Sequence, residues 1–146
     1  MEVGCDGFRH ISGLPFLRLN LGHSQITKAA IFHLQTIPLT CLNISYCRML
    51  DGIAIDYLVD MPLTQLDIEC CPKITNIGLA FLSKLPLTDL VIRWSSNITD
   101  SDIISLSNCP LSRLAFSGSN ITDHRCQFTP ITYPHPRFKI SVYVWL

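Results

Sequence analysis

A Pro-Leu pair recurs four times along the chain at a constant spacing of 24 residues. The pairs begin at Pro38, Pro62, Pro86 and Pro110, and a similar run of residues follows each of them. A repeat of this length is typical of a solenoid, in which each unit buries its apolar face only by stacking on its neighbours. The sequence therefore predicts an array of about five 24-residue repeats.

The hydrophobic period changes partway through each unit, which indicates a short strand followed by a short helix. In the third unit, Leu66 and Ile68 alternate with Asp67, as expected of a strand with one buried side. Each helix should end before the next Pro-Leu pair, because proline cannot donate a backbone hydrogen bond. Four rows of apolar residues predict the buried helix faces: Ala29, Ile31, Leu34 and Ile37; Ile53, Ile55, Leu58 and Met61; Ile77, Leu79, Leu82 and Leu85; and Ile103, Leu106 and Cys109.

Cysteines recur at one position of the unit. Cys47 and Cys71 each stand five residues after a strand leucine, and Ser95 and Ser119 take the corresponding place in later units. The odd total of seven cysteines argues against a disulfide framework, so we expect buried thiols at these positions. A serine can still fill this inward slot with a small group that is able to bond a neighbouring loop. The cysteines and histidines lack metal-ligand spacing, so no metal is expected.

The runs from Leu39 to Leu58 and from Leu63 to Leu82 resemble the cysteine-containing leucine-rich repeat. The resemblance covers about residues 14–123 and implies an α/β solenoid, a right-handed horseshoe with parallel strands on the concave side and short helices on the convex side. The family is best known from the substrate-binding arms of F-box ubiquitin-ligase adaptors, and similar arrays occur in bacterial effector proteins. It implies recognition of a protein partner on the concave strand face, in a ubiquitin-ligase system or as an effector acting on host proteins.

Both ends of the array are expected to be irregular. We assign residues 1–13 to an N-terminal cap, 14–123 to the array and 124–146 to a C-terminal segment. With Leu17 as its strand leucine, the first unit has one extra residue before Ile26. The C-terminal segment is rich in proline and ends in an alternating aromatic run. It is interpreted either as a cap or as a strand that pairs with another chain, so self-association through the chain ends stays open.

The strand residues that point away from the helices are the candidates for partner binding. Asp67, Glu69 and Asp89 should form an acidic patch beside arginines, with aromatic side chains at the rim. The alternative interpretation is a solvated face whose opposite charges pair across the strands. The candidates are Asn43, Ser45, Tyr46, Gln65, Asp67, Glu69, Asp89, Arg93, Trp94 and Arg113.

Other classes of function receive little support from the sequence. The chain has 11 basic and 11 acidic residues, so it lacks the positive charge of a nucleic-acid binder. It also lacks an apolar run long enough to span a membrane and an N-terminal secretion signal, so we expect a cytoplasmic protein, in its own cell or in a host. Asp67 and Glu69 would be open to water, and nothing orients His23 beside Cys47, so we expect neither an enzyme nor a cofactor.

Overall fold

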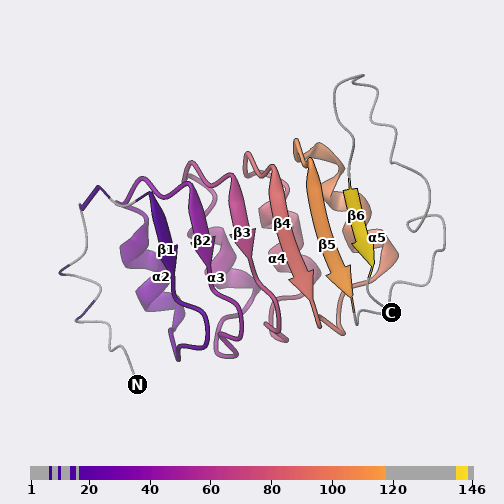
Figure 1. The fold of residues 1–146 in the computed structure, drawn as a ribbon. Helices are drawn as coiled ribbons and strands as arrows, with labels where there is room; N and C mark the ends of the chain where they lie inside the picture. Colours follow the sequence, from indigo (N-terminus) through magenta and orange to yellow (C-terminus); the bar gives the residue numbers. More distant parts are fainter. Residues whose placement is uncertain (1–6, 8–9, 11–13, 16, 118–140, 145–146) are drawn as a thin grey trace.

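The computed structural model describes residues 7, 10, 14–15, 17–117 and 141–144. Six parallel strands form one sheet in which every strand lies beside the next in the chain (Figure 1). The strands are β1 (Arg18–Asn20), β2 (Cys41–Asn43), β3 (Gln65–Asp67), β4 (Asp89–Arg93), β5 (Arg113–Ser117) and β6 (Ser141–Val144).

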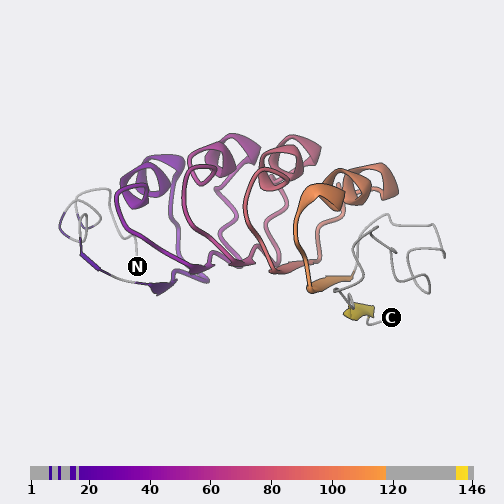
Figure 2. The same ribbon diagram turned by 90° about the horizontal axis from the view of Figure 1, so that it is seen from above.

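Short helices connect the first five strands and lie in a single layer behind the sheet (Figure 1). They are α2 (Lys28–Leu34), α3 (Gly52–Asp56), α4 (Asn76–Leu82) and α5 (Asp100–Ser105), and a 3-10 helix, η1 (Leu106–Asn108), follows α5. Seen from above, the sheet curves so that the strands line the inner side and the helices the outer side (Figure 2). The predicted α/β solenoid, with concave strands and convex helices, is confirmed. None of the helices in the described ranges is long and apolar enough to cross a bilayer.

The strand register confirms the 24-residue period and corrects the first unit. Leu42 pairs with Leu66, and Leu66 with Leu90, at steps of 24 residues. The residue paired with Leu42 in the first unit is Leu19 and not Leu17, the strand leucine expected from the sequence. Leu17 is 58% exposed, while Leu19 packs on the core. The first unit therefore has one residue fewer before Ile26, not one more.

The buried helix faces agree with the predicted rows except at their first positions. Ile53 and Ile77 were predicted to face the core, but they are 54% and 55% exposed, and Ala29 is also exposed. Each is the second residue of its helix, and the next residue along, Ala30, Ala54 or Gly78, is the one that turns inward. The remaining members of the predicted rows are buried.

Gly52 allows α3 and α4 to approach each other closely. A Cβ at Gly52 would lie 2.8 Å from the backbone nitrogen of Gly78, a contact that a flexible side chain could not relieve. The small inward residues therefore bring the first turns of these two helices together.

Gly52→Ala should lower the free energy of unfolding by about 1–3 kcal/mol, because the added methyl group overpacks this contact. Lys28→Ala, at the exposed first residue of α2, is the matched control and should change stability little. Urea unfolding of the two variants measures the difference. Equal stabilities would show that α3 and α4 can separate without loss.

Buried thiols bond each unit to the one before it. The Sγ atom of Cys47 donates to the carbonyl oxygen of Leu21 at 3.2 Å, and that of Cys71 donates to Ile44 at 3.2 Å. Cys109 makes a similar bond to Leu82 at 3.3 Å. Burial raises the pKa of Cys71 to about 12 and that of Cys109 to about 11, so both thiols keep the proton that they donate.

Ser95 fills the same slot in the next unit, but its hydroxyl group makes no such bond to a described residue. Its side chain is 1% exposed, and its Oγ atom has no hydrogen-bond partner among the described residues. An oxygen lies closer to Cβ than a sulfur does, so the hydroxyl group does not reach as far as the thiol. Ser95 therefore fills the inward slot as expected but does not use its ability to bond a neighbouring loop, while Ser119 lies outside the described residues.

Ser95→Cys should raise the free energy of unfolding by about 1–2 kcal/mol, because it replaces an unsatisfied buried hydroxyl with a donor of the right length. Cys71→Ser is the reciprocal change and should lower stability by a similar amount. Chemical unfolding under reducing conditions measures both. A destabilised Ser95→Cys variant would contradict the role given to the thiols.

The C-terminal segment contributes a strand to the sheet of its own chain. Residues Ser141–Val144 pair in parallel with β5, with Ser141 opposite Arg113. The rest of 124–146, and most of the proposed cap at 1–13, lies outside the described residues.

Candidate functional site: the concave strand face

An asparagine or aspartate side chain closes a turn at the end of each of the first three strands. The Oδ1 atom of Asn20 accepts from the backbone of Gly22 at 2.9 Å, and Asp67 accepts from that of Glu69 at 2.9 Å. Asn43 does the same for Ser45 at 2.9 Å. Such bonds hold the backbone in a turn two residues long.

The fourth and fifth strands lack this turn and are longer. Val91 and Ala115 occupy the position of Asp67, and neither side chain can accept a hydrogen bond. β4 and β5 each have five residues, whereas β1, β2 and β3 each have three. One repeat position therefore sets how far each strand extends across the concave face.

Ser45 lies inside this turn and does not face outward as predicted. Its side chain is 8% exposed, and its hydroxyl group donates to Asn43 Oδ1 at 2.7 Å. Ser45 therefore orients Asn43 and offers little surface to a partner.

A row of residues with left-handed backbone follows the strands. His23, Tyr46, Cys70 and Trp94 have φ angles of 61°, 61°, 54° and 58°. Residues other than glycine rarely adopt this conformation, which carries a modest strain. We call these four residues the rim row, because they border the strand face where the strands end.

Two aromatic rings of the rim row, those of His23 and Tyr46, stack on each other. The rings of His23 and Tyr46 are 4.2 Å apart at an angle of 12°. The Tyr46 hydroxyl group donates to Glu69 at 3.2 Å, and hydrogen bonding to Cys70, with the nearby charges of Cys70 and Glu69, raises the pKa of Tyr46 to about 12. Tyr46 is thus a neutral donor at physiological pH. Trp94, farther along the rim, is 61% exposed and keeps its ring available to a partner.

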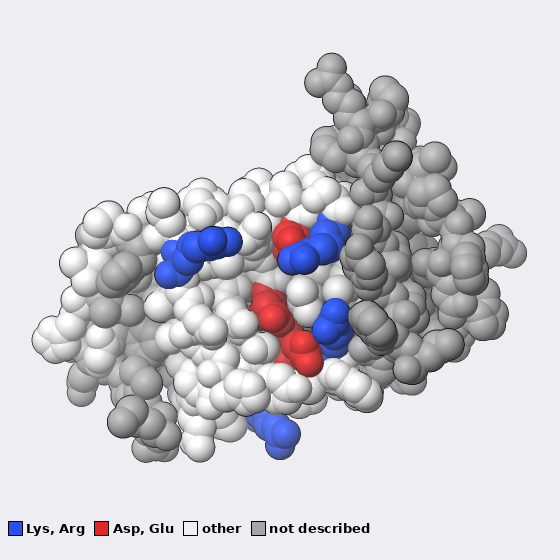
Figure 3. Space-filling model, viewed as in Figure 1, with Lys and Arg blue, Asp and Glu red and all other residues white. Residues whose placement is uncertain are grey.

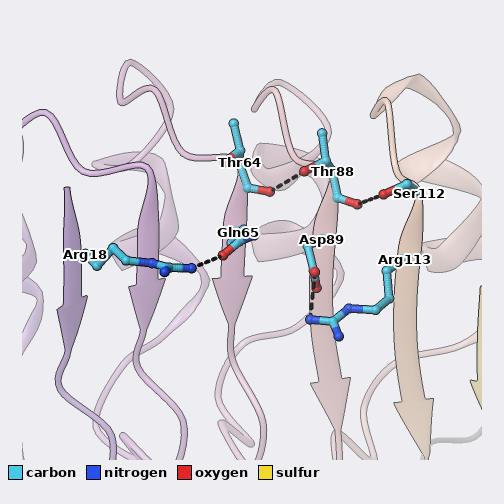
Figure 4. Close-up of polar contacts among 7 residues, drawn as sticks. All are labelled: Arg18, Thr64, Gln65, Thr88, Asp89, Ser112 and Arg113. Atoms are coloured by element: carbon cyan, nitrogen blue, oxygen red, sulfur yellow. Dashed lines mark hydrogen bonds and ion pairs between the residues drawn. The ribbon is translucent and has the colours of Figure 1, made fainter.

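At the start of the strands, hydroxyl groups form a series of hydrogen bonds that runs across the sheet. Thr64 donates to the carbonyl oxygen of Thr40 at 3.1 Å. Thr88 donates to that of Thr64, also at 3.1 Å (Figure 4). Ser112 continues the series by donating to Thr88 at 3.0 Å (Figure 4). These bonds run from unit to unit and hold the strand face in register.

Charged side chains gather on the middle of the concave face, with acidic groups between basic ones (Figure 3). Arg113 and Asp89 form an ion pair at 2.6 Å, and Arg18 reaches over β2 to donate to Gln65 Oε1 at 3.1 Å (Figure 4). The arginine of the ion pair is 56% exposed and the aspartate 17%. The alternative interpretation of pairing across the strands therefore holds for this one pair.

Asp67 is partly buried and forms no ion pair with a described residue. Its Oδ2 atom accepts a long hydrogen bond of 3.4 Å from Asn43. Burial is the main cause that raises the pKa of Asp67, and the charges of Glu69 and Asp89 add to it, while the Glu69 backbone hydrogen bond and the charge of Arg93 act in the opposite direction. The Nε atom of Arg93 is itself buried and has no hydrogen-bond partner among the described residues.

A shallow hollow of about 190 Å³ lies between the charged side chains. This volume is below the range of about 300–1,000 Å³ that is usual for cofactors and drug-sized ligands. The hollow has room for a single side chain of a partner. It is lined by Cys41, Leu42, Asn43, Gln65, Leu66, Asp67, Asp89, Val91 and Arg113.

The arrangement favours binding over chemistry. Asp67 lines the shallow hollow on the strand face and Glu69 is partly exposed, so both carboxylates lie on an open surface. The Cys47 thiol is buried, and burial raises its pKa, so it is a poor nucleophile. In the part of the chain that the structure describes, no three His, Cys, Asp or Glu side chains are placed to hold a metal ion.

Comparison of the sequence with known protein families gives one match. Residues 59–83, which span β3 and α4, match the family model described as leucine-rich repeat. The fold is a leucine-rich-repeat solenoid. A search of the curated proteins gives no match. Leucine-rich repeats generally mediate protein–protein interaction, and the match agrees with a non-catalytic binding module.

Most of the predicted site residues lie together on the concave side of this leucine-rich-repeat solenoid. Nine of the ten have partly or largely exposed side chains there, with Ser45 the exception. Sequence reasoning missed the stacking of His23 on Tyr46 and the reach of Arg18 to Gln65. A strict 24-residue period points to Gly22 and Leu17 instead. The first strand is offset from the second by 23 residues, which brings His23 into the rim row and Arg18 into the row of Gln65, and the repeat pattern did not indicate this offset.

Asp67 should titrate above its ordinary pKa of about 3.9. Because the native state then binds more protons than the unfolded state, the free energy of unfolding should fall as the pH rises through the interval between the two pKa values. Asp67→Asn should remove this pH-dependent contribution to the free energy of unfolding. Carboxyl NMR titration, with urea unfolding across the same pH range, checks both; an Asp67 pKa at or below the ordinary value would contradict the burial argument.

Proposed function

We propose that the chain is a protein-interaction module whose concave strand face binds a protein partner. The observation that carries the proposal is the exposed Trp94 ring, held by a strained backbone directly after β4, the strand whose Asp89 and Val91 line the charged hollow. Tryptophan, tyrosine and arginine are the side chains that most often anchor protein interfaces. The proposed contacts are Asn43, Tyr46, Gln65, Asp67, Glu69, Asp89, Arg93, Trp94 and Arg113, with Ser45 supporting Asn43.

The proposal extends to two finer roles for the same surface. The first is substrate recognition within a ubiquitin-ligase system, and the second is action on host proteins as a pathogen effector. Support comes from the thiol bonds of Cys47 and Cys71, which give a structural use to the cysteines that resemble those of the adaptor arms. Co-purification of a cullin-type component favours the first role and contradicts the second.

A cytoplasmic location is part of the proposal. The buried thiols of Cys47, Cys71 and Cys109 act as hydrogen-bond donors and must stay reduced, which suits a reducing compartment. Neither a membrane nor a nucleic acid is proposed as a partner. The alternative, a structural segment that associates through its ends, predicts a mass in solution that rises with concentration.

The test compares two triple variants with equal charge changes. The concave variant carries Glu69→Lys, Arg113→Glu and Trp94→Ala. The convex control carries Asp56→Lys, Lys28→Glu and Ile104→Ala, at exposed helix positions where Ile104 is 65% exposed. Partners captured from lysate by the parent chain are identified by mass spectrometry, and circular dichroism verifies that both variants fold.

We expect the concave variant to lose the partner and the control to retain it. The loss should be at least about tenfold, since anchor residues often contribute 2 kcal/mol or more. Retention by the concave variant together with loss by the control would move the binding site to the helices and contradict the proposal.

A further inference from the structure

The hollow on the concave face combines an aliphatic wall with a carboxylate. Val91 and the exposed edge of Cys41 supply apolar or weakly polar surface, while Asp67 and Asp89 supply charge. A side chain with a long apolar stem and a cationic end would match both features.

The two carboxylates are not equally available to a cation. Asp89 is already paired with Arg113 at 2.6 Å. Asp67 lies one strand away and has no cationic group within ion-pair distance among the described residues. The neighbouring Gln65 oxygen is already occupied by Arg18 at 3.1 Å. Asp67 is thus the acceptor in the hollow that lacks a charged partner.

The geometry of Asp67 also indicates which cation it can take. Its Oδ1 atom is committed to the backbone N–H of Glu69 at 2.9 Å, so only Oδ2 remains, with a long bond of 3.4 Å from Asn43. A guanidinium group binds best when both carboxylate oxygens are free to accept its fork. An ammonium group is a compact point charge and needs only one oxygen.

We propose that the hollow receives a lysine side chain of the protein partner, with its stem against Val91 and its ammonium group on Asp67 Oδ2. This inference rests on the proposed function and names the chemistry of the partner at that surface. The bound ammonium group would compensate a partly buried carboxylate that the free protein leaves without an ion pair. The Asp67 pKa should therefore fall when the lysine binds.

The probes are two blocked pentapeptides that differ only at the central residue, which is lysine or Nε-acetyl-lysine between alanines. Each is titrated into the isotope-labelled full chain and followed by amide NMR. We expect the lysine peptide to shift the amides around Asp67 in a saturable manner and to bind about tenfold more tightly than the acetylated peptide. A third peptide with central arginine should bind more weakly than the lysine peptide.

Asp67→Asn should weaken binding of the lysine peptide about tenfold, because it removes the charge but keeps an oxygen for the turn. The matched control is Asp56→Asn, which removes one negative charge from an exposed helix position and should leave the affinity unchanged. Equal binding of the lysine and acetyl-lysine peptides overturns the inference. So does equal binding by the Asp67→Asn variant, or the lack of saturable shifts around Asp67.

Capture of the partner from lysate by the two concave-face variants distinguishes a failure of this inference from a failure of the proposed function. If the concave triple variant loses the partner and Asp67→Asn retains it at full affinity, the concave face is the binding surface and the lysine contact is wrong. If both variants retain the partner, the proposed function itself fails.

Discussion

Parallel pairing of strands in a strict register is the constraint on which the rest of this structure depends. Leu42, Leu66 and Leu90 lie side by side because the chain returns to the sheet after 24 residues each time. The hydroxyl bonds at the strand starts and the thiol bonds behind the strand ends then join equivalent points of successive units. Each bond depends on the register, and together they hold it. Because contacts in a solenoid are made between neighbours, a change at one position acts on the two adjoining units.

The repeat period was enough to predict the sheet, the direction of its strands and the buried thiols. Those features depend on apolar residues that recur at fixed offsets, and burial of apolar surface dominates the folding free energy. The helix rows failed only at Ala29, Ile53 and Ile77. Each of these residues stands two positions before the next member of its row, and residues two apart do not share a helix face. The inward position falls instead on Ala30, Ala54 or Gly78.

The site was less predictable, because its shape depends on local hydrogen bonds that a hydrophobic pattern does not encode. The pattern of alternation put Ser45 on the outer face, but the turn closed by Asn43 buries it. The longer β4 and β5 follow from valine and alanine at the turn position, where the sequence pattern showed only ordinary strand residues. The left-handed backbone of Tyr46 and Trp94 is unusual for residues other than glycine, so propensity alone would have argued against it. The Ser95 hydroxyl group lacks a hydrogen-bond partner among the described residues because it reaches less far than a thiol group. The spacing of residues in the sequence does not show this difference.

Backbone strain and a partly buried carboxylate occur on the same side of the molecule. The rim row holds four residues in a sparsely populated conformation, and the strand face beside it carries a carboxylate whose burial raises its pKa. The hydroxyl bonds at the strand starts and the thiol bonds behind the strand ends stabilise this surface without covering it. Such local violations of the simplest rules are characteristic of functional surfaces.

Site-specific photo-crosslinking tests the central claim, that the concave face is the binding surface, most directly. A photoreactive amino acid is placed at Trp94 on the concave rim or at Ile104 on α5, two positions with exposed fractions of 61% and 65%. We expect a covalent adduct with a partner protein from position 94 and none from position 104 when cells expressing the full chain are irradiated. An adduct formed from position 104 alone would contradict it.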